Sequence, residues 1–395
     1  MHLLHIIDSF SPAAGGPPEA LKQLIRATRA CGTEVEVVCL DHPEAEYLKD
    51  IVCPVHALNQ TFLGRFAFSP RLWRWLHENA AHYDAIVMNG VWSFPGVALH
   101  FAARRAGTPY GIFTHGALDP WFNRKYRLKY VKKLIYWPVQ YSVLRHAFAV
   151  FFTTVAERDL AKTSFRPNRW NSVVVPYGIT EPEECEGGSE AQIEEFHAAL
   201  PGLGGRRYLL FLGRIHEKKG CDLLIKAFAR IAGAVPDVDL VIAGPDQSGI
   251  QAKLERLAER TEIAGRVHWP GMIAGSVKWG ALRSCEAFVL PSHQENLGIS
   301  VVEALAVGRP VLISHQVNLW PEIKDDGVGL AEEDTLEGTL RLLERWFSLD
   351  PLEQAAMAAR ARPCFCTRFS MKEAAASIND AFHSLEFSSR KLEPA

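Results

Sequence analysis

Residues 291–311 read PSHQENLGISVVEALAVGRPV and contain two glutamates, Glu295 and Glu303, in a strand–loop–helix setting. The apolar run that leads into this stretch predicts a buried strand, and the polar residues that follow predict a loop carrying Glu295. Gly298 then opens an apolar segment that predicts a helix ending at Gly308, with Glu303 about one and a half turns in. The pattern is typical of an α/β chain with a ligand loop at a strand end.

A helix start of this kind suits an anion. Its first backbone N–H groups have no partner within the helix, and the helix dipole is positive there. A carboxylate before the helix and one within it can accept hydrogen bonds from hydroxyls that flank a diphosphate. The spacing of Glu295 and Glu303 therefore favours a nucleotide-sugar site. The same sequence would also fit a solvated loop glutamate and a helix glutamate in an ion pair.

A second segment, LLFLGRIHEKKGCDLLIKAFARI at residues 209–231, places two cations in a similar setting. A predicted buried strand ends at Gly213, and Arg214 and Lys219 then precede an amphipathic helix. Arginine can bind two phosphate oxygens at once, and lysine adds a compact positive charge. The pair suits a diphosphate, although two exposed charges beside a turn would look the same.

Together these segments resemble glycosyltransferase family 4, which comprises retaining transferases with the GT-B fold. The resemblance covers nearly the whole chain and is strongest over residues 207–330. It implies that Arg214 and Lys219 contact the donor diphosphate, that Glu303 binds the ribose, and that Glu295 orients the donor sugar. The loop and helix start would also bind the donor, through Asn296, Leu297, Gly298 and Ile299.

The N-terminal loop is the third segment with family character. It follows an apolar run at residues 2–7 and contains Gly15 and Gly16, whose lack of side chains lets a ligand approach the backbone. It does not match the GxGxxG fingerprint of a dinucleotide dehydrogenase. The resemblance implies that this loop faces the donor phosphate and the acceptor.

A fourth segment, PYGIFTHGALDPWF at residues 109–122, ends a predicted strand at His115-Gly116. A histidine at a strand end is by itself more often structural. The resemblance implies that His115 and Gly116 lie near the sugar and the acceptor. Asp119 follows closely and is a candidate for orienting an acceptor hydroxyl.

The order of predicted elements indicates two α/β domains. One core rarely exceeds about 300 residues, and the chain has 395. Strands that alternate with helices favour parallel sheets. We expect two Rossmann-like domains, over 1–195 and over 196–369. The resemblance implies that they face a cleft as an acceptor-side domain and a nucleotide-sugar domain, and that a C-terminal helix at 370–395 crosses back to the first. Strands are predicted at residues 2–7, 34–40, 84–88, 109–114, 148–153, 171–176, 207–213, 238–244, 266–269, 286–291 and 310–314.

Composition argues against several classes of protein. A net charge of −2 does not favour a nucleic-acid binder, and eight scattered cysteines without a CxxC pair suggest reduced thiols. We expect no signal peptide and no spanning helix, hence a cytoplasmic location. Asp237 and Asp239 form an Asp-x-Asp pair, but they read as a turn into a strand. We therefore expect no metal and no cofactor besides the donor.

Residues 121–150 are basic and aromatic and contain no acidic residue. Such a segment can lie on an anionic membrane surface, at the inner face of the plasma membrane. It can also be a solvated face whose aromatics enter the core, or it can bind single-stranded nucleic acid. The family makes a lipid-linked or polysaccharide acceptor the better interpretation.

The predicted function is retaining transfer of a sugar from a nucleotide-diphosphate sugar to a glycan or lipid-linked acceptor. Residues 310–330 resemble bacterial members that build exopolysaccharide or lipopolysaccharide sugars. Two alternatives stay open: a nucleotide-sugar 2-epimerase of the same fold, and a non-catalytic nucleotide-sugar-binding protein. The sequence names neither the base and sugar of the donor nor the acceptor.

Overall fold

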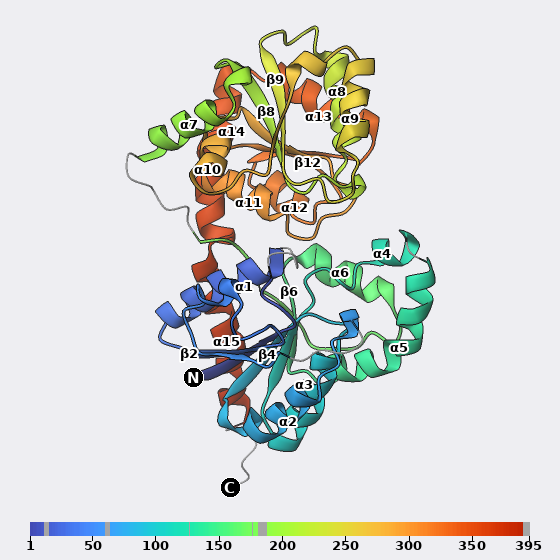
Figure 1. Cartoon of the computed structure of the whole chain (residues 1–395), viewed down its shortest axis with the longest axis vertical. Helices are drawn as coiled ribbons and strands as arrows, with labels where there is room; N and C mark the ends of the chain where they lie inside the picture. The colour runs from blue at the N-terminus through green and yellow to red at the C-terminus, as the bar shows by residue number, and fades with distance from the viewer. Residues whose placement is uncertain (12–15, 60–63, 126, 176, 181–187, 390–395) are drawn as a thin grey trace. The chain divides into compact units, whose positions relative to one another are not determined.

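The computed structural model describes the chain except for residues 12–15, 60–63, 126, 176, 181–187 and 390–395. Contacts divide the chain into two units (Figure 1). The first unit is Met1–Thr180 with Met371–Ala395, and the second is Glu181–Ser370. Residue 195, the predicted end of the first domain, lies inside α7 (Gly188–Ala199), which packs on α10 (Gly275–Ser284) of the second unit.

The first unit is built on a parallel sheet of seven strands in the order β3-β2-β1-β4-β5-β6-β7. The strands are β1 (His2–Ile7), β2 (Glu34–Cys39), β3 (Val55–Ala57), β4 (Ala85–Asn89), β5 (Tyr110–Phe113), β6 (Ala149–Phe152) and β7 (Ser172–Val174). The helices include α1 (Gly16–Ala30), α2 (Pro70–Asn79), α3 (Phe94–Ala106), α4 (Pro120–Lys125), α5 (Arg127–Arg145), α6 (Val155–Ser164) and α15 (Met371–Ser389). The C-terminal α15 packs against α1 of this unit.

The second unit repeats the plan with six parallel strands in the order β10-β9-β8-β11-β12-β13. The strands are β8 (Arg207–Leu212), β9 (Val238–Ala243), β10 (Val267–Gly271), β11 (Ala287–Leu290), β12 (Val311–Ser314) and β13 (Gly329–Glu332). Besides α7 and α10, the helices are α8 (Cys221–Ile231), α9 (Gln251–Arg260), α11 (Ile299–Ala306), α12 (Trp320–Asp325), α13 (Leu336–Ser348) and α14 (Pro351–Arg368).

The α/β architecture with two parallel, Rossmann-like sheets is confirmed. The central strands are buried on both faces, which explains why they read as nearly continuous apolar runs. Two strands escaped the sequence analysis, β3 and β13, which are edge strands of three and four residues. Neither strand is buried along its whole length, so neither reads as a continuous apolar run. Among the described residues, no helix is both long and apolar enough to cross a bilayer.

Candidate functional site

Two predicted donor segments meet at the carboxyl edge of the second sheet. Strands β8 and β11 are parallel neighbours, so the loops that follow them leave the sheet on the same side. Gly220, in the loop after β8, has a φ of 69°, and a Cβ there would overlap the carbonyl oxygen of Pro291 after β11. The close approach requires glycine and brings the cation loop against the glutamate loop.

Lys219 and Glu295 are in direct contact through Nζ and Oε2, with side chains only 10% and 16% exposed. Burial, together with the nearby cations Lys218 and Arg214, lowers the pKa of Lys219 to about 7. The adjoining carboxylate favours the charged ammonium and opposes that shift. The structure thus pairs the two residues that sequence reasoning had placed in separate motifs.

The backbone around Glu295 is held by the loop that follows β12. The Glu295 N–H donates to the carbonyl of Gln316 (2.9 Å), and the N–H of Asn318 donates to the carbonyl of Glu295 (3.1 Å). Gly298 has a φ of 68°, and a Cβ there would lie 3.3 Å from the Glu295 Cγ. The turn between Glu295 and α11 is therefore tight and specific to glycine. No pattern in the sequence predicts that residues 316–318 support this loop.

The predicted helix start after Gly298 is confirmed, because α11 begins at Ile299. Leu297 is buried beneath it, at 7% exposure. Asn296 accepts a hydrogen bond at its Oδ1 from the Asn318 side chain (3.3 Å). Leu297 therefore anchors the loop in the core, while Asn296 joins it to the neighbouring loop.

Glu303 on α11 is also paired with a lysine. The Lys278 ammonium on α10 lies 2.7 Å from its Oε1 and 4.3 Å from the ring centre of Trp279. The sequence analysis did not single out Lys278, since it belongs to no motif and only the packing of α10 beside α11 brings it there. Both glutamates are thus held by cations from other elements.

Arg214 is exposed and stands at the end of β8. Its guanidinium donates to the side-chain oxygen of Gln247 (3.0 Å), in the loop after β9. Asp246 orders that loop by accepting from the N–H groups of Ile250 and Gln251, both at 3.1 Å. Exposure leaves the guanidinium open to an anionic ligand at the same sheet edge as Lys219.

The two aspartates of the Asp-x-Asp pair bind arginines at the other end of the sheet. Asp237 pairs with Arg207 (2.7 Å), and Asp239 is buried and bonded to Arg206 (2.9 Å) and His268 (2.8 Å). Both residues precede or begin β9, whereas ligand loops in parallel sheets follow the strands. Their positions fit the predicted turn into a strand.

In the first unit, His115 follows β5 in a left-handed turn with a φ of 46°, and Gly116 continues it at 74°. The imidazole stacks on Phe113 (5.4 Å between ring centres) and meets Tyr177 edge-on (5.8 Å). Burial lowers the pKa of His115 to about 4, so the ring is neutral at pH 7. Its Nε2 is buried without a hydrogen-bond partner in the described structure, and could bond a ligand hydroxyl.

Glu157 on α6 fixes this turn, and the sequence analysis missed it. One carboxylate oxygen accepts from the Thr114 hydroxyl (2.5 Å) and the Gly116 N–H (2.6 Å). The other accepts from the N–H and hydroxyl of Thr153, both at 2.7 Å. Because Glu157 is only 4% exposed, these donors replace its hydration. A Thr-x-x-Glu capping pattern at Thr154 was visible, but not its link to the distant turn.

The other first-unit candidates have different positions. Asp119 is buried at 8% exposure and accepts from the Trp121 N–H (2.7 Å), which caps α4. Gly16 is the first residue of α1, and Gly15 lies outside the described residues. Asp8, at the end of β1, was not predicted; burial raises its pKa to about 6, against a hydrogen bond from Ser93 (3.2 Å).

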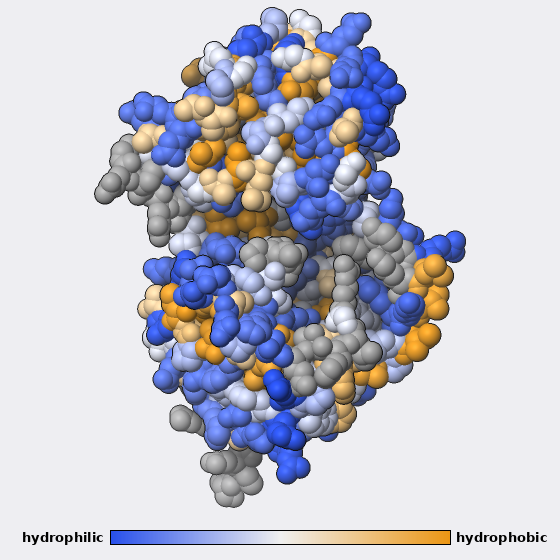
Figure 2. All heavy atoms as spheres, in the orientation of Figure 1, coloured by the Kyte–Doolittle hydropathy of each residue, from blue (hydrophilic) through white to orange (hydrophobic). Residues whose placement is uncertain are grey.

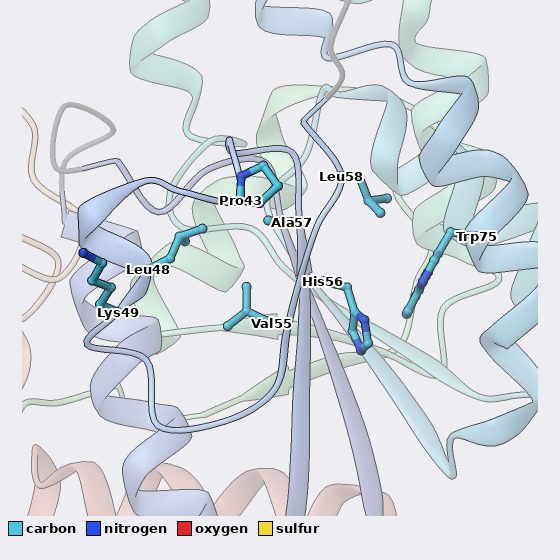
Figure 3. Close-up of a pocket in the computed structure, with 8 residues that line it drawn as sticks. All are labelled: Pro43, Leu48, Lys49, Val55, His56, Ala57, Leu58 and Trp75. Carbon is cyan, nitrogen blue, oxygen red and sulfur yellow. The ribbon is translucent and has the colours of Figure 1, made fainter.

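A cavity of about 480 Å³ lies beside the edge strand β3 (Figure 3). No predicted site residue lines it, and two of its polar side chains are already engaged. Lys49 pairs with Glu46 (2.7 Å), and His56 pairs with Glu36 (2.7 Å). The predicted chemistry lies at the strand ends instead of in this cavity.

Comparison with known proteins shows which family the chain matches. A family model described as glycosyl transferases group 1 matches residues 192–362, and one described as a glycosyl transferase 4-like domain matches residues 15–178. A phosphatidyl-myo-inositol mannosyltransferase of Mycobacterium leprae is 26% identical over 332 residues, covering 80% of this chain and 79% of that protein. An alpha-D-kanosaminyltransferase of Streptomyces kanamyceticus is 30% identical, but the match spans only 44% of either chain.

Solved structures share the whole fold. The crystal structure of Anabaena HepE in complex with UDP has a TM-score of 0.77 at 19% identity, covering 97% of this chain and 100% of that chain. WaaG, a glycosyltransferase involved in lipopolysaccharide biosynthesis, has a TM-score of 0.68 at 18% identity, covering 95% and 99%. At such identities the likeness shows the fold alone, which is GT-B.

Proposed function

The chain belongs to the group 1 glycosyltransferases of the family 4 type, and we propose that it transfers a sugar from a nucleotide-diphosphate sugar with retention of configuration. The proposal is carried by the contact between Lys219 and Glu295, which joins the loop after β8 to the loop after β11. One loop offers cations for a diphosphate and the other offers carboxylates for hydroxyls. A nucleotide-sugar has both kinds of group.

The proposed roles follow from charge. Arg214 and Lys219 neutralise the charge that grows on the leaving diphosphate, a preorganised electrostatic role. Backbone amides at the start of α11 assist there. Glu303 accepts hydrogen bonds from the ribose and Glu295 from the donor sugar. The other proposed contacts are the donor-loop residues Gly15, Gly16, Asn296, Leu297, Gly298 and Ile299, and the acceptor-side residues His115, Gly116 and Asp119.

Two ion pairs position the carboxylates of the proposed site. Each glutamate is held by a lysine, Glu295 by Lys219 and Glu303 by Lys278. A bound diphosphate would compete for Lys219, and ribose hydroxyls would compete for Glu303. The lysines thus hold both carboxylates near their working positions at little cost in reorganisation.

We propose that turnover needs no divalent metal, with the cations after β8 replacing it. The engagement of Asp237 and Asp239 by arginines and His268 supports this view. Turnover should persist in EDTA. Loss of turnover in EDTA with recovery on manganese would contradict the proposal.

The acceptor is proposed to be a glycan or a lipid-linked sugar in polysaccharide or lipopolysaccharide biosynthesis. The name of the relative from Mycobacterium leprae, a phosphatidyl-myo-inositol mannosyltransferase, includes a lipid, which supports a lipid-linked acceptor. The alternatives, an epimerase and a non-catalytic binding protein, differ in products. An epimerase would convert the donor without an acceptor, and a binding protein would leave it intact.

The deciding experiment begins with a thermal-shift screen against UDP-, GDP-, ADP- and dTDP-sugars. The donor that stabilises the protein is then incubated with candidate acceptors, and NMR follows the first product formed. We expect the anomeric configuration of the donor to be kept. An inverted product, or donor conversion without acceptor, would overturn the proposed reaction.

We further propose that α5 makes the protein bind reversibly to anionic membrane. Exposed aliphatic side chains follow one side of the helix, Leu128 (85% exposed), Val131 (53%), Ile135 (77%) and Val139 (42%), visible as an orange band at the edge of Figure 2. Exposed cations flank them at Arg124, Lys125, Arg127 and Lys132. A face that is apolar and basic fits an anionic bilayer.

Aromatic side chains of this segment pack into the protein instead of facing a membrane. Trp137 is buried at 3% exposure, and Tyr130 packs on Phe165 (5.5 Å). They enter the core because large rings gain most from burial. The proposed membrane face is therefore aliphatic. We propose that this face binds the inner face of the plasma membrane.

Flotation with phosphatidylglycerol–phosphatidylcholine vesicles tests this face. Ile135→Asp should abolish flotation, and Lys132→Glu should reduce it at low salt. The matched control is Leu352→Asp on α14 of the second unit, where the leucine is 81% exposed. Equal flotation of wild type and Ile135→Asp would reject the surface. Stronger binding to a single-stranded oligonucleotide would favour the nucleic-acid alternative.

A further inference from the structure

Trp92 has an unusual backbone conformation for a bulky residue. It lies between β4 and α3 with a φ of 71°, in the left-handed region that side chains other than those of Gly, Asn and Asp rarely adopt. Such a conformation persists only where the surroundings hold it, and it often marks a functional position. Trp92 is also at the carboxyl edge of the first sheet, where ligand loops lie.

Helix α5 holds Trp92 from one side. The Trp92 N–H donates to the Oε1 of Gln140 (2.8 Å), a side chain only 3% exposed. The Lys133 ammonium lies over the indole, 4.7 Å from the ring centre. The Trp137 ring lies 5.8 Å from the indole, centre to centre. Three contacts from one helix therefore fix the indole relative to α5.

The indole reaches the acceptor-side turn from its other end. Its Nε1–H donates to the carbonyl oxygen of Ala117 (3.1 Å), the second residue after His115. Glu157 holds the opposite flank of the same turn through the Gly116 N–H. The left-handed pair at His115 and Gly116 is thus fixed between α6 and, through Trp92, α5.

We propose that Trp92 is a positioning residue that ties the His115–Gly116 turn to α5, so that a displacement of α5 moves the turn. The functional part of this proposal rests on the proposed glycosyl transfer, in which that turn meets the sugar and acceptor. Docking of the aliphatic face of α5 on a bilayer would then be transmitted to His115. The mechanical link itself needs no assumption about the reaction.

A purely local role for Trp92 makes a different prediction. If the indole only fills the core, substitutions on α5 that leave it in place should not affect the turn. If Trp92 links α5 to the turn, a change at Gln140 should affect the turn, even though the hydrogen bond of Gln140 is to the Trp92 backbone. The two roles are separated by measuring the turn itself.

Amide hydrogen exchange of a peptide covering residues 114–120 provides that measurement without substrate. Trp92→Phe keeps a ring but loses the Nε1–H bond, and we expect about fivefold faster exchange there, the factor that about 1 kcal/mol of lost hydrogen bonding gives. Gln140→Leu should give a similar increase, and the double variant less than the sum of both. Trp73→Phe on α2, at a tryptophan that is 36% exposed, is the matched control and should not change exchange at 114–120.

Unchanged exchange at 114–120 in Trp92→Phe would overturn the positioning role, and unchanged exchange in Gln140→Leu would overturn the link to α5. If either variant fails to fold, exchange of the wild-type protein in the presence of vesicles tests the link instead. Anionic vesicles of phosphatidylglycerol should change exchange at 114–120, and neutral phosphatidylcholine vesicles should not. No change in the presence of bound anionic vesicles would also reject the link.

Activity gives a separate readout. Trp92→Phe should raise the acceptor KM or lower kcat several-fold, while the affinity for the nucleoside diphosphate chosen by the screen, measured by calorimetry, stays within about twofold. Equal losses on donor and acceptor sides would indicate general damage and reject the positioning role. If the wild type shows no transfer, the proposed function fails, but the exchange results still decide whether the link exists.

Discussion

The two units differ in how the polar side chains at the carboxyl ends of their strands are stabilised. In the second unit, charged side chains from different elements compensate one another, as in the contacts of Lys219 with Glu295 and of Lys278 with Glu303. In the first unit, the ring of His115 is kept neutral by burial, and the carboxylate of Glu157 is satisfied by backbone and hydroxyl donors. The difference suggests that the second edge is prepared for a charged ligand and the first for a neutral one.

This contrast can be tested most strongly by acid. Burial lowers the pKa of His5 to about 3 and that of His115 to about 4, both in the first unit. The unfolded chain therefore binds protons that the folded unit does not, and stability present above about pH 6.5 falls as pH falls. From pH 7 to 5 each of these two rings should contribute a loss of about 2 kcal/mol.

Thermal unfolding against pH measures the loss. Asparagine tolerates the left-handed backbone, so His115→Asn should reduce the loss between pH 7 and 5 by about 2 kcal/mol. The exposed His82→Gln is the matched control and should leave the curve unchanged. If His115→Asn loses as much stability as the wild type between pH 7 and 5, the His115 ring is not held neutral.

The next largest effect on stability is expected from removing the Glu157 carboxylate, which holds the His115 turn. Glu157→Ala leaves the Gly116 N–H and the Thr153 N–H without acceptors in a buried place. We expect a stability loss of about 3 kcal/mol, since hydrogen bonds to a charged group contribute about 1.5–3 kcal/mol each. Chemical denaturation with a probe in each unit should show the first unit unfolding earlier. An unchanged midpoint for the first unit would exclude a structural role for Glu157.

Substitutions among the charged residues of the second unit's site should affect the rate of transfer more than the stability of the protein. Arg214→Ala should lower kcat by at least about tenfold, and on the order of a hundredfold, because a cation aimed at growing charge stabilises the transition state more than the ground state. Steady-state kinetics measures this against Arg260→Ala, an exposed arginine on α9. A rise in donor KM with unchanged kcat would reassign Arg214 to ordinary binding.

The smallest expected effect concerns Glu303. Glu303→Ala should weaken donor binding by about 2 kcal/mol, or roughly thirtyfold, through the loss of ribose hydrogen bonds. Calorimetry with the donor measures it, and the exposed Glu344→Ala on α13 is the control. If the donor affinity is unchanged, the ribose assignment is incorrect and Glu303 serves mainly as the partner of Lys278.

Much of the second unit's candidate site was visible in the sequence. The strand ends at Gly213 and before Glu295, and the helix start after Gly298, were predicted within a residue or two of their observed places. These features are local, since glycines, buried runs and polar breaks occur within about twenty residues. Their partners were not predicted, because Lys278 and residues 316–318 are near in space only after the helices and strands have packed.

The sequence by itself determined the alternation of strands and helices, the parallel sheets, and which loops carry cations and carboxylates. Each of these depends on short-range spacing and on the burial of apolar runs. Only the tertiary structure decided that Lys219 meets Glu295, that Glu157 shapes the His115 turn, and that Trp92 joins this turn to α5. Those contacts connect residues tens of positions apart, and local periodicity carries no information about such pairs.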